Sequence, residues 1–184
     1  MDALVMCGGR GTRLDSDAEK PLFPVGGVPM VDRVVAALGD SSFEGIYAVV
    51  SPNAPETAAH LDVPRIETPG EGYVADLDAA LDDGRVSPPV LTVAADLPLL
   101  DGEVLDRTLA AHEGGSLTVL VPAALKRDLG VSDDAAFVAD GRRVAPTGVN
   151  VVGDGPDDAT VVADRRLAVN VNTLTDARVA EEWL

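Results

Sequence analysis

The feature that most constrains this chain is an apolar run near its start that breaks into a glycine loop. The run from Leu4 to Cys7 is typical of a buried strand, and Lys20 follows the loop within a Glu-Lys-Pro sequence. Glycines let backbone N–H groups approach an anion closely and permit positive φ, and nearby cations neutralise phosphate charge. We therefore predict a phosphate-binding turn, formed by Gly8, Gly9, Arg10, Gly11, Thr12 and Arg13.

Two common phosphate loops are excluded by the spacing. The loop lacks the Gly-Lys-Ser/Thr ending of a P-loop, and the third glycine of a dinucleotide fingerprint would fall at Leu14. A tight strand-to-helix turn with solvated arginines is the simpler alternative.

Length and cysteine content bound the class of protein. The 184 residues suit a single domain, residues 1–184, with a sizeable core. We expect no signal peptide and no membrane-spanning segment, because the start lacks a basic region and no apolar run is long enough. The single cysteine, Cys7, excludes a disulfide framework and favours the cytoplasm.

The charge of the chain restricts its partners. The net charge is −17, from 22 Asp and 9 Glu against 12 Arg and only 2 Lys. Such a surface repels nucleic acid and anionic membranes, so we expect neither as a partner. We hypothesise a salt-loving host, because salt screens this self-repulsion; an ordinary acidic protein is the alternative. Lys20 lies in the loop motif, and we expect Lys126 in a loop.

Hydrophobic periodicity predicts an α/β fold with a mostly parallel central sheet and helices on both faces. Strands are expected at about 2–7, 46–50, 65–68, 89–95, 117–121, 148–152 and 168–172. Helices are expected at about 29–38, 56–61, 74–81 and 103–112, and Thr173 is expected to cap a C-terminal helix. We expect 122–140 to be irregular apart from a hairpin at Asp140-Gly141, and 154–158 to be a loop.

Several unusual sequences fall where predicted strands end. In open α/β sheets, ligands bind outside the carboxyl ends of the strands. The glycine loop, Ser51 to Asn53, Gly70 to Tyr73, Asp96 and the pair Asn170 and Asn172 all occupy such places. Each signal alone is weak, but a shared edge predicts one site.

Asp96 is the candidate metal ligand of this edge. It follows an apolar strand, where a carboxylate can coordinate Mg²⁺ that bridges phosphate oxygens. The alternative is a turn aspartate before Pro98. Asn170 and Asn172 are two apart in a predicted strand and share a face. They are suited to metal-bound water, ribose or a second substrate, or else they form a turn-stabilising pair.

The remaining candidates would surround a base. Gly70 and Gly72 leave bare backbone against which a planar ring can lie, and Tyr73 either stacks on that ring or packs in the protein. Ser51 and Asn53 supply donors and acceptors for a purine edge, or form a plain turn. Cys7 is expected to pack as a small apolar residue.

The quoted motifs resemble a known family. Gly-Gly-Arg-Gly-Thr-Arg-Leu at 8–14, with Glu-Lys-Pro-Leu at 19–22, resembles the signature of nucleotidyltransferases that activate sugar phosphates and cofactor precursors. Nearly the whole chain is similar to one branch, the archaeal GTP:adenosylcobinamide-phosphate guanylyltransferases. That likeness includes Ser-Pro-Asn at 51–53, Gly-x-Gly-Tyr-x-x-Asp-Leu at 70–77, Gly-Val-Asn-Val-Val at 148–152 and Asn-Val-Asn-Thr at 170–173.

The resemblance implies a Rossmann-like nucleotidyltransferase fold, often a homodimer. It implies transfer of GMP from GTP to adenosylcobinamide phosphate, in which the glycine loop wraps the triphosphate. Arg13, Lys20 and Asp96 would be the catalytic residues, with Asp96 on Mg²⁺. The second-substrate region would comprise Gly148, Asn150, Asn170 and Asn172.

Three alternatives stay open. Molybdenum cofactor guanylyltransferases typically read Gly-Gly-x-Ser-x-Arg-Met-Gly where this chain reads Gly-Gly-Arg-Gly-Thr-Arg-Leu-Asp. Sugar-phosphate nucleotidyltransferases share the loop but are usually longer. A nucleotide-binding regulatory subunit would keep the fold without turnover. The family's usual second metal carboxylate has no clear counterpart here, which leaves strict Mg²⁺ dependence open.

Overall fold

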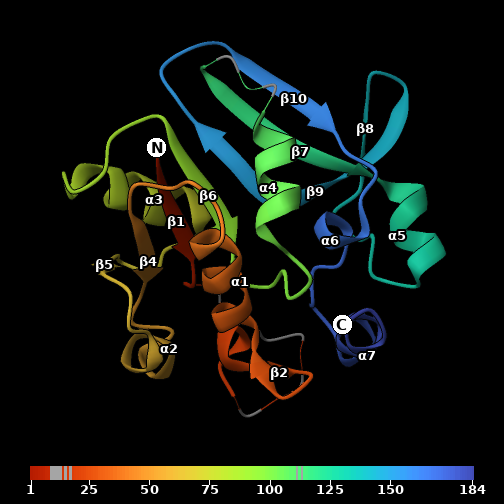
Figure 1. Ribbon diagram of the computed structural model, residues 1–184, viewed down its shortest axis with the longest axis horizontal. Helices are drawn as coiled ribbons and strands as arrows, with labels where there is room; N and C mark the ends of the chain where they lie inside the picture. Colours follow the sequence, from red (N-terminus) through yellow and green to blue (C-terminus); the bar gives the residue numbers. More distant parts are fainter. Residues whose placement is uncertain (9–13, 15, 17, 111, 113) are drawn as a thin grey trace.

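The computed structural model describes residues 1–8, 14, 16, 18–110, 112 and 114–184. Within them, eight strands form one sheet in the order β10-β7-β9-β6-β1-β4-β5, with β8 paired to the start of β9 (Figure 1). The strands are β1 (Asp2–Met6), β4 (Ile46–Val50), β5 (Arg65–Glu67), β6 (Val90–Ala94), β7 (Ser116–Pro122), β8 (Phe137–Ala139), β9 (Arg142–Val152) and β10 (Asp157–Val161). A separate hairpin pairs β2 (Pro24–Val25) with β3 (Val28–Pro29).

The sheet is mostly parallel, as predicted. β5, β4, β1 and β6 run in one direction. β7 and β10 share that direction, because β9 pairs antiparallel with both β6 and β7. The carboxyl ends of the parallel strands therefore meet at one edge, where a ligand site is expected.

Helices cover both faces of the sheet. Their bounds are η1 (Lys20–Leu22, a 3₁₀ turn), α1 (Met30–Gly39), α2 (Pro55–His60), α3 (Tyr73–Asp82), α4 (Gly102–Leu109), α5 (Ala123–Leu129), α6 (Arg165–Ala168) and α7 (Leu174–Glu182). Neighbouring residues of β1 point to opposite faces. Val5 packs in one core with Val34 of α1 and Leu105 of α4, whereas Leu4 packs in another with Ala80 of α3.

The C-terminal segment closes the site edge. Val169 and Val171 are fully buried in a third apolar cluster with Ala177 of α7. Thr173 caps α7 as predicted, within a capping box completed by Asp176. In Figure 1 the C-terminal helix lies beside the β2–β3 hairpin, which it also contacts.

Three expectations about secondary structure are wrong. Residues 123–129 form helix α5, which begins after Pro122 and ends at Gly130 in the left-handed conformation. Residues 157 and 158, expected to be loop, begin the edge strand β10, which continues to residue 161. Residues 168–172 are not a strand: their alternation arises because Val169 and Val171 face a core. The backbone of this segment is tied to the end of β6 by a hydrogen bond from the Val171 N–H to the Asp96 carbonyl at 3.0 Å.

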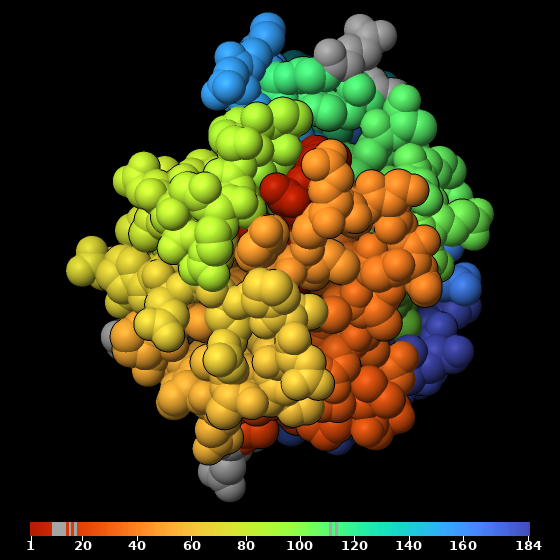
Figure 2. Space-filling model, turned by 60° about the vertical axis from the view of Figure 1, so that its left-hand side comes forward, coloured from red at the N-terminus to blue at the C-terminus, as the bar shows by residue number. Residues whose placement is uncertain are grey.

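The opposite, amino-terminal edge of β1 is closed by an ion pair. The N-terminal amino group lies 2.6 Å from Glu44 Oε1. In Figure 2 the red start of the chain reaches the surface beside the orange segment that carries Glu44. Among the described residues, no helix is long and apolar enough to cross a membrane.

Candidate active site

Asp96 follows β6 at the centre of the carboxyl edge, and polar side chains from distant segments converge on it. Lys20 Nζ donates to Asp96 Oδ2 at 2.6 Å and to Asn172 Oδ1 at 2.9 Å. Asn170 Nδ2 donates to Asp96 Oδ1 at 3.1 Å. The Lys20 and Asp96 side chains are only 18% and 16% exposed. The structure thus brings together four residues that the sequence placed in one site.

Glu19 holds the turn that carries Lys20. Its carboxylate accepts hydrogen bonds from the Glu56 N–H at 2.9 Å, the Thr57 N–H at 2.7 Å and the Thr57 hydroxyl at 2.6 Å. These groups lie in the first turn of α2, where N–H groups lack helical partners and an anion is favourable. Sequence reasoning gave Glu19 no role. The sequence feature that could have indicated its partner is Pro55, because proline is typical of the first position of a helix.

Hydrogen bonds hold the segment of Asn170 and Asn172 in place of a strand ladder. Asn170 Nδ2 also donates to the Thr147 carbonyl at 2.7 Å. The Asn172 N–H donates to Asp176 Oδ2 at 3.0 Å. Both asparagine side chains therefore reach the site, although the strand expected to align them is absent from this described segment.

Lys126 is a site residue that sequence reasoning missed. It lies in α5, not in a loop, and is 4% exposed. Its ammonium donates to the Ala168 carbonyl at 2.6 Å and to Asn170 Oδ1 at 3.1 Å. Burial lowers the pKa of Lys126 below its ordinary value, and the charge of Asp96 opposes that shift. The sequence feature that could have indicated a special role for Lys126 is the rarity of lysine, with 2 lysines beside 12 arginines.

A hollow of about 220 Å³ opens on the glycine-loop side of Asp96. Gly8, Gly72, Tyr73, Asp76 and Asp96 are among the residues that line it. The Tyr73 hydroxyl lies 2.8 Å from the hydroxyl of Thr92. Bare backbone, an aromatic ring and two carboxylates suit a nucleoside, which has a flat ring and polar edges.

Asp76 is a second residue to which sequence reasoning gave no role. It is 4% exposed, and its Oδ1 accepts the Gly70 N–H at 2.7 Å. A Cβ on Gly8 would lie 2.9 Å from Asp76 Oδ2, so Gly8 is required for this close approach. The sequence feature that could have indicated this role is the spacing: Asp76 lies four residues before buried Ala80 and therefore on the same inward face of the helix.

Ser51 and Asn53 hold the neighbouring loops together. Ser51 Oγ donates to the Gly8 carbonyl at 3.4 Å, and Asn53 Nδ2 donates to the Gly70 carbonyl at 3.0 Å. Gly70 has φ +75°, and a Cβ there would lie 2.6 Å from Asn53 Nδ2. These contacts give both residues a structural part; their contact with a base stays a prediction.

Cys7 behaves as a buried apolar residue, as expected. It is 1% exposed, and burial raises the pKa of its thiol to about 12. A thiol in that state is a poor nucleophile at neutral pH. Gly9, Arg10, Gly11, Thr12 and Arg13 lie outside the described residues, so their predicted roles stay predictions.

A second hollow, of about 250 Å³, lies on the other side of Asp96. Gly148, Asn170, Asn172 and Lys126 line it, and Ala94 and Asp96 are shared with the first hollow. Gly148 has φ +84°, and a Cβ there would lie 2.7 Å from the Ala94 side chain. Asp96 therefore stands where two separate hollows meet.

Asn150 does not lie with the other second-substrate candidates. Its Nδ2 donates to the Tyr73 hydroxyl at 3.4 Å, beside the first hollow. The reason is strand direction: β9 is antiparallel to β6, and Asn150 pairs with Thr92, two residues before the end of β6. Moving from Gly148 to Asn150 therefore leads away from the carboxyl edge.

The oxygen atoms that bind the Lys20 ammonium also suit a magnesium ion. Asp96 Oδ2 and Asn172 Oδ1 already converge on one cation, the ammonium of Lys20. Mg²⁺ prefers oxygen ligands and commonly uses one or two protein groups, with water and phosphate completing its shell. Among the described residues, no three His, Cys, Asp or Glu side chains cluster to hold a metal. The protein part of such a site would therefore be Asp96 with Asn172.

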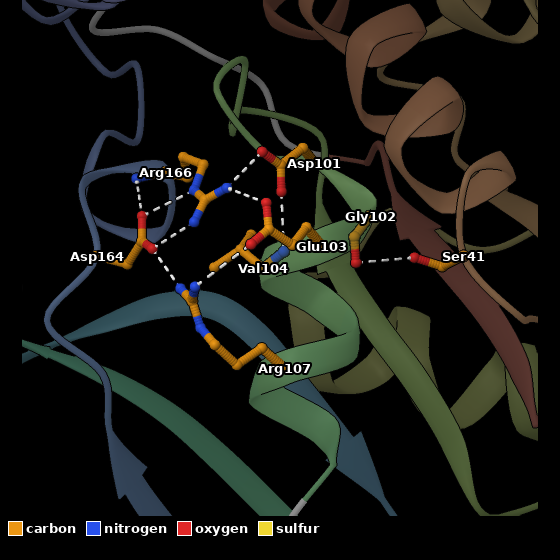
Figure 3. Close-up of polar contacts among 8 residues, drawn as sticks. All are labelled: Ser41, Asp101, Gly102, Glu103, Val104, Arg107, Asp164 and Arg166. Carbon is orange, nitrogen blue, oxygen red and sulfur yellow. Dashed lines mark hydrogen bonds and ion pairs between the residues drawn. The ribbon is translucent and has the colours of Figure 1, made fainter.

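A network of ion pairs fixes the helix that precedes Asn170. Arg166 of α6 lies 2.6 Å from Asp101 Oδ2 and 2.7 Å from Asp164 Oδ2, and Arg107 of α4 lies 2.5 Å from Asp164 Oδ2 (Figure 3). Arg166 holds the pKa of Asp164 well below its usual range, with help from Arg107. Asp101 also caps α4, through the Val104 N–H at 2.8 Å. The network thus ties the segment after Asp96 to the segment before Asn170.

Comparison with known proteins shows the family of this chain. The family model described as the MobA-like NTP transferase domain matches residues 3–183. An adenosylcobinamide-phosphate guanylyltransferase from Methanocaldococcus jannaschii is 29% identical and aligns over 100% of this chain and 97% of its own length. The bifunctional protein GlmU of Streptomyces coelicolor is 33% identical over 64% of this chain, but over only 26% of its own length.

Solved structures agree on the fold. A putative glucose-1-phosphate thymidylyltransferase from Bacillus anthracis superposes with a TM-score of 0.71 over 100% of this chain and 94% of its own, at 13% identity. At that identity the likeness concerns the arrangement of helices and strands. The expected nucleotidyltransferase architecture is thereby confirmed.

Proposed function

The chain belongs to the MobA-like NTP transferase family, and we propose that it transfers GMP from GTP to adenosylcobinamide phosphate. The full-length similarity to a guanylyltransferase with that acceptor in its name supports the choice of substrates. The observation that carries the proposal is the place of Asp96, at the meeting of two hollows. A transfer between two substrates needs both reacting groups beside one charge-stabilising centre.

The reaction needs positioning more than proton transfer. An ionised oxygen of the acceptor phosphate attacks the α-phosphorus of GTP in line. The bond from that phosphorus to the β-phosphate oxygen breaks, and pyrophosphate leaves. Because the attacking oxygen is already charged, no general base is required, and catalysis rests on orientation and charge stabilisation.

Lys20 would exchange partners during this reaction. Without nucleotide, its ammonium is held by Asp96 and Asn172. Phosphate oxygens in the first hollow would compete for the same ammonium, and Arg13 and the backbone N–H groups of the glycine loop would donate to those phosphates as well. Lys20 would then offset the charge that develops on the departing pyrophosphate.

Mg²⁺, the cofactor we propose, would sit at Asp96 and Asn172. When bound there it would supply positive charge that offsets the negative charge of the reacting phosphates. Release of Lys20 toward the phosphates is what would free these two oxygen atoms for the metal. Asn170 is not part of this set, because its side-chain oxygen already accepts from Lys126.

Asp76 supports guanine as the base. Guanine presents its N1–H and its amino group as two adjacent donors, which one carboxylate can accept, whereas adenine presents an acceptor at N1. Asp76 lines the first hollow and is oriented by the Gly70 N–H at 2.7 Å. We expect Asp76→Asn to reduce the preference for GTP over ATP, and Asp78→Asn, an exposed change on the same helix, to leave it unaltered.

The cellular setting and the assembly are also proposals. The single cysteine favours the cytoplasm. A homodimer is suggested by the family resemblance alone. One domain carries the whole proposed reaction, since both hollows lie on the same sheet.

Pyrophosphate release tests the function directly. We would mix the protein with each of the four NTPs, Mg²⁺ and adenosylcobinamide phosphate in molar KCl. Release with GTP and this acceptor would establish both substrates together. Release only with molybdopterin or a sugar phosphate would keep the chemistry and overturn the acceptor. GTP binding without release for any acceptor would support a regulatory subunit instead.

A further inference from the structure

The chain has only two lysines, and both approach Asp96. Lys20 binds Asp96 Oδ2 directly at 2.6 Å. Lys126 reaches the other oxygen, Oδ1, through the amide of Asn170. Elsewhere this acidic chain uses arginine for its positive side chains, 12 in all. Compact ammonium groups are thus reserved for one centre.

The chemistry of Lys126 determines how Asn170 lies. A lysine ammonium has donors only, so the Asn170 group facing it must be the carbonyl oxygen Oδ1. The amide nitrogen then faces two acceptors, Asp96 Oδ1 at 3.1 Å and the Thr147 carbonyl at 2.7 Å. All three contacts agree on one orientation, and Lys126 supplies the partner of the oxygen.

Lys126 is also more deeply buried than Lys20. It is 4% exposed, and its second acceptor is the Ala168 carbonyl at 2.6 Å, at the end of α6. The charged groups that face it are Asp96, Asp133 and Asp176. When Lys20 turns to the phosphates, Lys126 stays as a buried cation near these carboxylates.

We propose that Lys126 is a positioning residue for Asp96: through Asn170 it holds that carboxylate in place while Lys20 engages the nucleotide. The catalytic part of this inference rests on the proposed function. The resting arrangement, in which Lys20 binds Asp96 directly and buried Lys126 reaches it through Asn170, does not. Outer-shell partners that orient metal-ligating side chains typically contribute about 10–100-fold to metal affinity or activity.

Kinetics of Lys126→Met give the first test, with Arg127→Met as the matched control. Arg127 is the next residue, carries the same charge and is 53% exposed on an ion pair with Asp133. We expect Lys126→Met to lower kcat at least about tenfold. The Kd for GTP should stay within about threefold, because the first hollow lies across Asp96. Arg127→Met should leave both constants near those of the wild type.

Labelling the side-chain nitrogen of lysine with ¹⁵N gives a second test that needs no turnover and leaves Lys126 unchanged. With two lysines, the wild-type protein has at most two ammonium signals, which Lys20→Met assigns. We expect the Lys126 signal to be protected from solvent exchange without ligand. On addition of GTP and Mg²⁺, the Lys20 signal should shift and the Lys126 signal should stay.

The outcomes separate this inference from the proposed function. Protein that shows a protected Lys126 signal but no turnover with any acceptor would keep the arrangement and overturn the reaction. A Lys126 ammonium that exchanges as fast as an exposed lysine would overturn the inference. So would turnover that is unchanged in Lys126→Met, or a Lys126 signal that shifts on GTP addition as far as that of Lys20.

Discussion

The ion pair between Lys20 and Asp96 should contribute to the stability of the resting protein and lose that contribution when nucleotide binds. The two atoms are 2.6 Å apart, and the side chains are 18% and 16% exposed. Exposed pairs contribute up to about 1 kcal/mol, and breaking a fully buried pair costs about 3–5 kcal/mol. A partly buried, charge-assisted hydrogen bond lies between these limits, so we expect a coupling of about 2 kcal/mol.

A double-mutant cycle measures this coupling. The free energy of unfolding in urea would be determined for wild type, Lys20→Met, Asp96→Asn and the double variant, all in molar KCl. The control cycle uses Glu103 and Arg107, whose charged groups lie 3.9 Å apart and are 79% and 52% exposed. That pair should couple by no more than about 0.5 kcal/mol.

Nucleotide binding gives the refuting condition. With saturating GTP the Lys20–Asp96 coupling should fall, because Lys20 then contacts phosphate. A coupling without GTP that is no larger than that of Glu103 and Arg107 would refute the resting ion pair. A large coupling that GTP leaves unchanged would refute the exchange of partners.

Two further changes test the α4–α6 network and the acidic surface. Arg166→Met should lower the free energy of unfolding at pH 7 by about 1–2 kcal/mol, since Arg166 binds Asp101 and Asp164 and is 23% exposed. Asp164 has a lowered pKa in the folded state, so its ion pairs contribute to the free energy of unfolding above the unfolded pKa of about 3.9, and this contribution is lost as pH falls from there toward the folded pKa. The free energies of unfolding of wild type and Arg166→Met, measured in urea, should therefore converge at acid pH. A difference that stays constant with pH would argue against the ion pairs. Wild-type stability should rise from low to molar KCl, because screening relieves the repulsion of a net charge of −17; a flat or falling dependence would exclude the salt-adapted surface.

The elements that the sequence predicted best are those with strong local signals. β1, β4 and β6 are continuous apolar runs, and each lies where it was expected. Helix α5 was missed although its signals were present: good helix formers between Pro122 and Gly130. The alternation of Val169 and Val171 with Asn170 and Asn172 was read as a strand, but alternation reports only which side is buried. Within the described chain, no neighbouring strand pairs with that segment.

The site divides in the same way. The sequence by itself determined the α/β class and the place of Asp96 at a strand end, because each depends on residue type and local spacing; the phosphate-binding role of the glycine loop stays a prediction. Only the tertiary structure decided that Lys126 is buried behind Asn170 and that Asp76 lines the first hollow. The tertiary structure also places Asn150 outside the second hollow, because β9 pairs antiparallel with β6. Such contacts join residues far apart in the chain, and they depend on the order and direction of strands that no local pattern specifies.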